Sequence, residues 1–354
     1  MKQADLADEN FEQSQETVDV PPPGRRANFD ALHRAALPLV QALEKTPDGD
    51  LIIETIAVAL KLLRDDTNRG DLKLINKSLK ELRYALKVFA PYRTVRKVSI
   101  FGSARTPSDA PDYQAALQFG RRMADAGWMV ITGAGGGIMA AGHGGAGAEP
   151  SFGLAIRLPF EQKTNEFISG DKKLINFKYF FTRKLMFVRS CHAVAMFPGG
   201  FGTLDEAFEV LTLVQTGKSA PIPIVLVDRP GGTYWKAWLD YVRRQLLDRG
   251  FINPDDLRLF KVTDDCDSAV AEVTRFYSNY HSLRYARRDL IIRLRRPPGR
   301  DLLARINREF ADISDGAPFR VSAALPVEKD EPALAAMPRL VFPFNRKDPA
   351  RLRM

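Results

Sequence analysis

The fold is decided by one stretch of the chain, Ala193-Val194-Ala195-Met196-Phe197-Pro198-Gly199-Gly200-Phe201-Gly202-Thr203-Leu204-Asp205-Glu206. Its first five residues are all apolar, which is typical of a short strand buried on both faces. After Glu206, apolar residues recur at helical spacing at Phe208, Leu211 and Val214. The stretch therefore predicts a buried strand, a glycine-rich turn and a helix that ends near Gln215.

The glycine-rich turn has the character of an anion site. Its three glycines let the backbone come close to a ligand, and the free N–H groups of the next helix point toward the same space. Glu206 adds a carboxylate within the first part of that helix. A phosphorylated sugar would suit both features. Thr203 and Glu206 also have the T-x-x-E spacing of a helix capping box, and taken alone the residues favour that structural interpretation.

Two further glycine turns follow predicted strands. Residues 102–105 (Gly-Ser-Ala-Arg) come after an apolar strand at 98–101, and residues 133–137 (Gly-Ala-Gly-Gly-Gly) come after a strand at 128–131. The second turn is not a dinucleotide fingerprint, because Ile138 stands where the last glycine is required. The triplet Gly217-Lys218-Ser219 is not a P-loop, because it ends a helix and lacks the upstream glycine.

The middle of the chain alternates between predicted strands and helices. Further strands are expected near 153–156, 222–227 and 259–262, and helices at 113–126, 180–190, 204–215 and 234–247. Such alternation predicts a parallel sheet covered on both faces, with ligands beyond the carboxyl ends of its strands. The fold class is therefore α/β, a Rossmann-like doubly wound sheet.

The segments on either side of this core differ from it. Residues 1–26 are polar and end in Pro21-Pro22-Pro23, so we predict a disordered tail. Residues 27–92 contain three helical patterns, at 29–43, 51–63 and 72–89, which predict a helical preface packed on the core or on a second subunit. The core is expected to span 93–281. Residues 282–354 are rich in arginine and predict a small α/β extension with strands at 289–294 and 340–344 and a helix at 302–313.

Composition limits the function classes. The chain has 354 residues, a formal charge of +9 and a pI near 9.5, which favours anionic ligands in general. With two cysteines, no leader-like segment and no run long enough to span a membrane, a reducing cytoplasm is the expected compartment. The four histidines are scattered without metal-ligand spacing, and no G-x-S-x-G motif occurs, so metal hydrolysis and serine-triad chemistry have no support.

The turn from Pro198 to Glu206 matches P-G-G-x-G-T-x-x-E at every fixed position, and the run from Arg183 to Met186 matches R-K-x-x-M. In these motifs the sequence resembles the LOG family, cytokinin-activating phosphoribohydrolases once described as lysine decarboxylases. The likeness extends over about 98–262, and the flanking segments resemble the longer members. One departure is that Ala140-Ala141 follow Gly137-Ile138-Met139, where the long form usually has G-I-M-E-A.

The resemblance implies a hydrolase that splits nucleoside 5'-monophosphates into a free base and ribose 5-phosphate, without a metal or organic cofactor. It implies that Glu206 and Arg183 are the catalytic residues and that the protein is a homodimer or higher homo-oligomer. The residues expected to contact the substrate and its phosphate are Ser103, Arg105, Gly136, Lys184, Gly199, Gly200, Gly202 and Thr203.

Two alternatives stay open. Relatives of this fold include carriers, so the chain is alternatively a non-catalytic nucleotide-binding or molybdenum-cofactor-binding protein. The second alternative is a nucleic-acid-associated protein that uses the arginine-rich segment after Ser282. That segment has few interleaved aromatic residues, which makes nucleic-acid binding the less expected outcome.

Overall fold

The computed structural model describes residues 38, 41–43, 46, 48–158 and 163–354. The predicted tail and most of the predicted helix at 29–43 lie outside these residues. By internal contacts the chain divides into two compact units, Met1–Arg83 and Tyr84–Met354. The four-part division expected from the sequence stays a prediction.

The first unit contains α3 (Gly49–Arg64) and most of α4 (Arg69–Phe89), so the helices predicted at 51–63 and 72–89 are confirmed. Helix α3 buries only Gly49 and leaves several large apolar side chains at least half exposed, namely Leu51, Ile52, Val58 and Leu63. None of the helices in the described part of the chain has the length and apolar surface that crossing a lipid bilayer requires.

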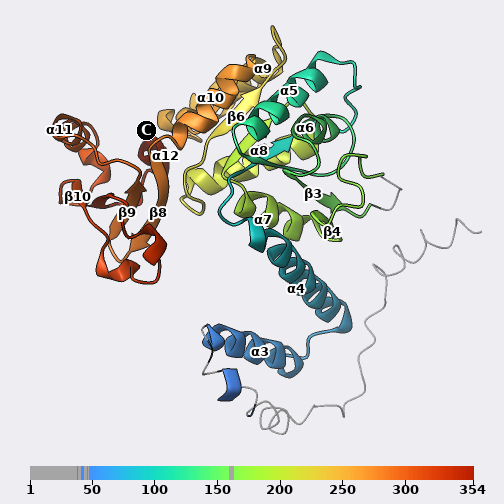
Figure 1. The fold of residues 1–354 in the computed structure, drawn as a ribbon, viewed down its shortest axis with the longest axis horizontal. Coiled ribbons are helices and arrows are strands. Elements are labelled where there is room, and N and C mark those ends of the chain that lie inside the picture. Colours follow the sequence, from blue (N-terminus) through green and yellow to red (C-terminus); the bar gives the residue numbers. More distant parts are fainter. Residues whose placement is uncertain (1–37, 39–40, 44–45, 47, 159–162) are drawn as a thin grey trace, which may run out of the picture. The chain divides into compact units, whose positions relative to one another are not determined.

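The second unit is built on a parallel sheet of seven strands (Figure 1). The strands are β1 (Lys97–Phe101), β2 (Met129–Thr132), β3 (Ser151–Ile156), β4 (Leu174–Phe177), β5 (Ala193–Met196), β6 (Ile224–Val227) and β7 (Lys261–Thr263). Every residue of β1, β2, β5 and β6 is buried, as continuous apolar runs in a doubly covered sheet require. Strand β4 was not predicted, and β7 begins two residues later than expected.

Helices cover both faces of this sheet. They are α5 (Pro111–Asp125), α6 (Ile138–Ala146), α7 (Phe180–Ser190), α8 (Phe201–Gln215), α9 (Tyr234–Tyr241) with a π-helical continuation (Val242–Leu247), and α10 (Cys266–Phe276). Successive side chains of β1 point to opposite faces of the sheet. Val98 and Ile100 pack in one cluster with α5 and α10, whereas Phe101 lies on the other face with its ring 4.7 Å from that of Phe187 on α7. The predicted doubly wound α/β class is confirmed.

The strand order is β4-β3-β2-β1-β5-β6-β7. The chain runs outward from β1 to β4 and then returns to place β5 beside β1, with Val98 paired to Ala193. The loops that leave β1 and β5 at their carboxyl ends therefore diverge to opposite sides. Such a switch point opens a crevice at the edge of the sheet, and this is where ligands of these folds bind.

A second sheet follows the core. It is antiparallel, in the order β10-β11-β9-β8, and consists of β8 (Tyr280–Ala286), β9 (Asp289–Leu294), β10 (Arg320–Ser322) and β11 (Arg339–Pro343), with α11 (Arg300–Glu309) and α12 (Pro349–Arg353). The predicted strand at 289–294 is confirmed residue for residue, and the predicted helix at 302–313 corresponds to α11 and a 3-10 turn. Strands β8 and β10 were not predicted.

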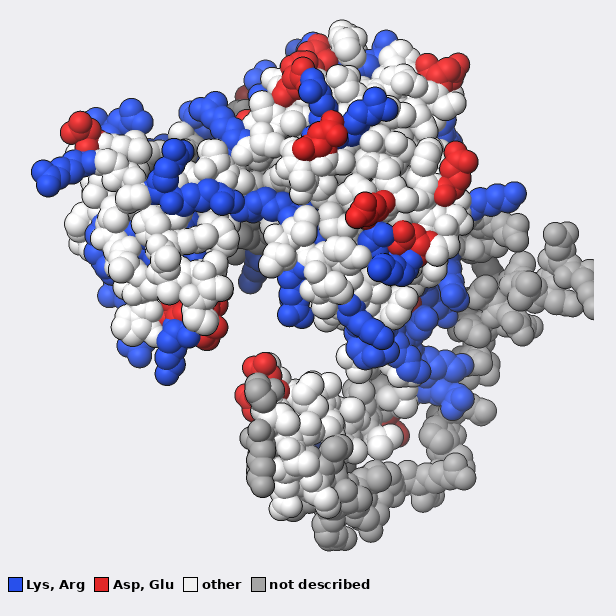
Figure 2. Space-filling model, in the orientation of Figure 1, with Lys and Arg blue, Asp and Glu red and all other residues white. Residues whose placement is uncertain are grey.

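Many arginines of this part form ion pairs. Glu328 lies between Arg293 and Arg339, with N–O distances of 2.8 and 3.1 Å, and all three side chains are almost completely buried. Neighbouring pairs join Arg284 to Asp330 and Glu331. Basic and acidic side chains are also interspersed on the surface shown in Figure 2. Some arginines of this arginine-rich segment therefore form buried ion pairs within the C-terminal sheet.

We predict that Glu328→Gln lowers the free energy of unfolding by about 3 kcal/mol, because removing one partner leaves buried arginine charges uncompensated. Urea unfolding of the full chain measures the change. The matched control is Glu309→Gln, since Glu309 pairs with Arg308 at 3.7 Å on the surface and contributes less than about 1 kcal/mol. Equal effects of the two substitutions would contradict the structural role of Glu328.

Candidate functional site

A cavity of about 750 Å³ lies at the carboxyl edge of the parallel sheet. Its walls come from the loops after β1, β2 and β3, from α7, and from the turn between β5 and α8. Polar and glycine residues that line it include Ser103, Arg105, Gly133, Arg183, Gly200, Gly202, Thr203 and Glu206. The cavity therefore occupies the crevice that the strand order creates between β1 and β5.

The turn after β5 is held against the turn after β1. The amide of Ser103 donates to the carbonyl of Pro198 at 3.0 Å. A Cβ at Gly199 would stand 2.2 Å from Oγ1 of Thr203 and 2.9 Å from the amide nitrogen of Ser103, so no side chain fits there. Gly199 is thus required by the close approach of two backbones, and it does not itself line the cavity.

The turn after β2 is also held against the turn after β1, at Ser103. Gly137 has a φ of +58°, and a Cβ there would stand 2.2 Å from the carbonyl oxygen of Ser103. The amide of Ile138 donates to that oxygen at 3.0 Å. Behind the turn, the buried His143 contacts Thr132 and Asn165, whose amide group donates to the carbonyl of Gly135 at 3.0 Å. This polar support fixes the loop that forms one wall of the cavity.

Helix α8 presents its amino end to the cavity. It begins at Phe201, with Gly200 as its N-cap and without a side-chain capping bond. The capping-box interpretation of Thr203 and Glu206 is therefore wrong, because both residues lie inside the helix. A Cβ at Gly200 or Gly202 would meet no atom within 4 Å, so the space before the first turn is open. Open space at a helix amino terminus suits an anion.

Glu206 lines the cavity although it is only 3% exposed. Its Oε1 lies 3.4 Å from Nζ of Lys184, while its buried Oε2 has no hydrogen-bond partner among the described residues. Burial raises the pKa of the Glu206 carboxyl group, and the positive charge of Lys184 acts in the opposite direction. One oxygen of the carboxylate is therefore paired within the protein, and the other is buried without a partner among the described residues.

Lys184 holds three carboxylates of α8. Its Nζ lies 2.8 Å from Asp205, 3.4 Å from Glu206 and 2.7 Å from Glu209. Burial alone would lower the pKa of Lys184, but the bonds to Asp205 and Glu209 outweigh it and raise that pKa. The structure thus places Lys184 behind the carboxylate of Glu206 and outside the residues that line this cavity.

Arg183, one residue earlier on α7, does line the cavity. Its guanidinium group lies 5.2 and 5.6 Å from the rings of Phe180 and Phe187. Its Nε is buried without a hydrogen-bond partner among the described residues. Burial lowers the pKa of Arg183, and the charge of Glu206 opposes that shift. An unsatisfied guanidinium is a ready donor to a phosphate or a nucleobase.

Seven of the ten residues predicted for the site line this one cavity. The three that do not are Gly136, Gly199 and Lys184. The sequence reasoning missed the apolar part of the lining, which includes Met139, Ile156, Leu158, Phe180 and Phe187. The aromatic residues on either side of Arg183 were the available signal, since a helix places positions three and four apart on one face.

The arrangement can bind an anion and place it beside a carboxylate. Three turns and a helix amino end surround one cavity, with Arg183 and Glu206 on its wall. Within the described residues, no three His, Cys, Asp or Glu side chains are positioned to hold one metal ion. The chemistry that these residues can supply is charge stabilisation next to a bound phosphate ester.

Comparison with known proteins agrees with the motifs. A family model described as possible lysine decarboxylase matches residues 136–273. A cytokinin riboside 5'-monophosphate phosphoribohydrolase from Mycobacterium tuberculosis is 30% identical over 171 residues, which cover 47% of this chain and 88% of that protein. A protein of the same name from Arabidopsis thaliana is 28% identical over 102 residues, which cover 28% of this chain but only 45% of the plant protein.

Similar solved structures include the molybdenum cofactor carrier protein of Chlamydomonas reinhardtii. It is 20% identical, and the match covers 51% of this chain and 97% of that protein with a TM-score of 0.35. Likeness at this level decides nothing about activity. The motif residues around Arg183 and Glu206, and the identity to the mycobacterial protein over most of its length, are the stronger findings. On these grounds the chain belongs to the LOG family.

Proposed function

We propose that the protein is a phosphoribohydrolase that cleaves the N-glycosidic bond of nucleoside 5'-monophosphates. The observation that carries the proposal is the carboxylate of Glu206, a residue that lines a cavity surrounded by glycine turns and whose buried Oε2 has no hydrogen-bond partner among the described residues. The names of the mycobacterial and plant relatives support the same reaction, and cytokinin nucleotides are a candidate substrate.

The reaction places positive charge on the sugar. As the bond between C1' and the base nitrogen breaks, its electron pair leaves with the base and the ribose becomes oxocarbenium-like. Water then supplies the oxygen that bonds to C1' and the proton that the base takes up. The products are a free base and ribose 5-phosphate. A carboxylate beside the ribose stabilises the developing charge, and we assign this role to Glu206.

The remaining residues would hold the substrate. The open space before α8, beside Gly200 and Gly202, is suited to the 5'-phosphate. The guanidinium group of Arg183, a residue that lines the cavity and whose buried Nε has no described partner, can donate to the phosphate or the base. Lys184 acts differently, as a positioning residue that holds Glu206 from behind. Ser103, Arg105 and Thr203 complete the proposed contacts.

The two alternatives gain less support. A carrier of a nucleotide or of the molybdenum cofactor needs the anion site but has no need of a buried carboxylate with a free oxygen. A nucleic-acid-binding segment after Ser282 would use its arginines for phosphate contacts, and three of them, Arg284, Arg288 and Arg293, are already paired with acidic side chains. The hydrolase is therefore the function that the site supports best.

We also propose that the protein acts in the cytoplasm as a homo-oligomer, at least a dimer. At the cavity Phe201 is 93% exposed and Phe180 is half exposed, and Phe181, the next residue of α7, is also half exposed. An exposed apolar group of this kind is typical of an interface. The exposed apolar residues of α3 are a second candidate interface. A monomeric mass of a fully active protein in light scattering would refute the oligomer.

The first test of the function is a chromatographic assay of the purified full-length protein against a panel of nucleoside 5'-monophosphates and the matching nucleosides. We expect release of free base and ribose 5-phosphate from at least one monophosphate. The matching nucleoside should be a poor substrate, because the phosphate binding energy is lost. Equal kcat/KM values for the two would contradict the phosphate site.

The second test is Glu206→Gln. We expect the rate to fall by about two orders of magnitude or more, because the amide keeps the shape of the side chain but not its charge. The matched control is Glu209→Gln on the same helix, which also removes a carboxylate from Lys184 at 2.7 Å but does not line the cavity. Wild-type turnover by Glu206→Gln at an unchanged melting temperature would remove Glu206 from the mechanism.

The third test uses pH. Only the ionised form of Glu206 stabilises a cation, so kcat/KM should decline as the pH falls through its raised pKa. Lys184→Met removes the charge that opposes this rise, so the pKa should rise further and the acidic limb of the profile should move to higher pH. Lys172→Met, at an exposed position, is the control. An unmoved limb in Lys184→Met would show that Lys184 does not tune Glu206.

A further inference from the structure

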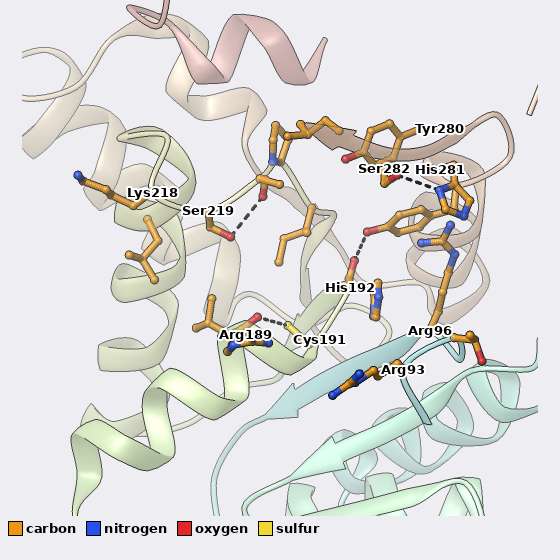
Figure 3. Close-up of a pocket in the computed structure, with 18 of the residues that line it drawn as sticks. Arg93, Arg96, Arg189, Cys191, His192, Lys218, Ser219, Tyr280, His281 and Ser282 are labelled. Atoms are coloured by element: carbon orange, nitrogen blue, oxygen red, sulfur yellow. Dashed lines mark hydrogen bonds between the residues drawn. The ribbon is translucent and has the colours of Figure 1, made fainter. Parts of the chain in front are cut away.

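A second cavity, of about 1150 Å³, lies at the opposite edge of the parallel sheet (Figure 3). Arg96 directly precedes β1, His192 directly precedes β5, and Ile222 lies just before β6, so this edge is formed by the amino ends of the strands. The far wall comes from the C-terminal sheet, beginning with Tyr280 of β8. Of the residues that line this cavity, only Lys184 has a role in the proposed reaction, where it positions Glu206.

The lining of this cavity has a surplus of positive charge. Five of its basic side chains form no ion pair with any described acidic residue, namely Arg93, Arg96, Arg189, Lys218 and Arg295. Its two acidic side chains each lie in an ion pair, Glu209 with Lys184 at 2.7 Å and Glu331 with Arg284 at 2.9 Å. Figure 3 shows that the labelled cations come from three separate segments around the cavity, which carry Arg93 and Arg96, Arg189, and Lys218.

The central part of the wall is ordered by contacts within the protein. The guanidinium group of Arg96 stacks 3.6 Å from the ring centre of Tyr277, and the hydroxyl of Tyr277 donates to the carbonyl of His192 at 2.7 Å. Stacking fixes the plane of the guanidinium and leaves its edge available for hydrogen bonds. The side chain of Arg96 makes no hydrogen bond to a described residue of the cavity, so its donors are free for a ligand.

The pKa values of the two histidines in the wall are lowered. Burial, together with the charges of Lys97 and Arg96, lowers the pKa of His192 to about 4. Burial and the charges of Arg96, Arg295 and Arg293 also lower the pKa of His281, although Glu331 opposes that shift. A protonated imidazole is disfavoured here mainly because it is buried, and the neighbouring cations add to that effect. A bound anion would relieve that repulsion.

We propose that this cavity is a second ligand site, which binds a small polyanion carrying two or more phosphate or carboxylate groups. Guanidinium groups bind both chemistries through paired N–H donors. Cations on at least three segments match a ligand with more than one charged group. The site is separate from the nucleotide cavity, because the two share none of the lining residues.

The test is titration calorimetry of the full-length protein with pyrophosphate at low ionic strength. We expect saturable binding that Arg93→Glu and Arg189→Glu each weaken about tenfold or more, as expected for the loss of a charged hydrogen bond. Both side chains are exposed and make no described bond, so the variants should fold. Arg121→Glu makes the same charge change at an exposed position outside both cavities and should bind like the wild type.

Two further arms determine where the anion binds and which chemistry it needs. Arg183→Gln removes an anion ligand from the nucleotide cavity and should leave pyrophosphate binding unchanged if the second cavity is the site. Citrate in place of pyrophosphate distinguishes carboxylates from phosphates. The proposal is overturned if pyrophosphate does not bind saturably, or if Arg121→Glu loses as much affinity for pyrophosphate as the two cavity variants. It is also overturned if only Arg183→Gln loses affinity, or if the protein binds a single-stranded oligonucleotide but neither small anion. The outcome does not depend on the hydrolase activity.

Discussion

The site depends on the hydrogen bonds of one residue, Ser103. Its amide donates to Pro198 in the turn after β5, and its carbonyl accepts from Ile138 at the start of α6. Its hydroxyl accepts from the amide of Arg105 at 3.1 Å. Three strands thus end in turns that are held together at one point. The start of α8, and with it the position of Glu206, follows from this junction because Gly199 leaves no room for another arrangement.

Helix α7 has two functions because consecutive helical residues point about 100° apart. Arg183 faces the nucleotide cavity, whereas Lys184 lines the second cavity and reaches across to the acidic residues of α8. Lys184 is therefore in contact with Glu206 on one side and with a basic cavity on the other. The two motif residues Arg183 and Lys184 therefore lie in two different charged environments. From the sequence alone, both would be expected on one basic face of the helix.

The sequence predicted those elements whose signals are local. Apolar runs identified β1, β5 and β6, and the glycine turns identified the edge of the sheet that binds the ligand. Helix α6 was missed because it contains glycines, which are poor helix formers. Those glycines allow close packing: a Cβ at Gly142 would stand 3.1 Å from Ile100 of β1, and one at Gly145 would stand 1.9 Å from the carbonyl oxygen of Leu117 in α5. The second cavity was missed because its walls come from segments far apart in the chain.

The role of Glu206 in the T-x-x-E sequence could not be decided from the sequence alone. The same four residues fit a capping box or a catalytic carboxylate, and the choice depends on where the helix begins. Tertiary contacts at Gly199 start α8 at Phe201, so Glu206 lies more than a turn inside the helix and cannot reach the N-cap amide. A buried carboxylate with one unpaired oxygen costs free energy of folding. A residue kept in that state destabilises the free protein, and a ligand that supplies positive charge at that oxygen would remove the cost.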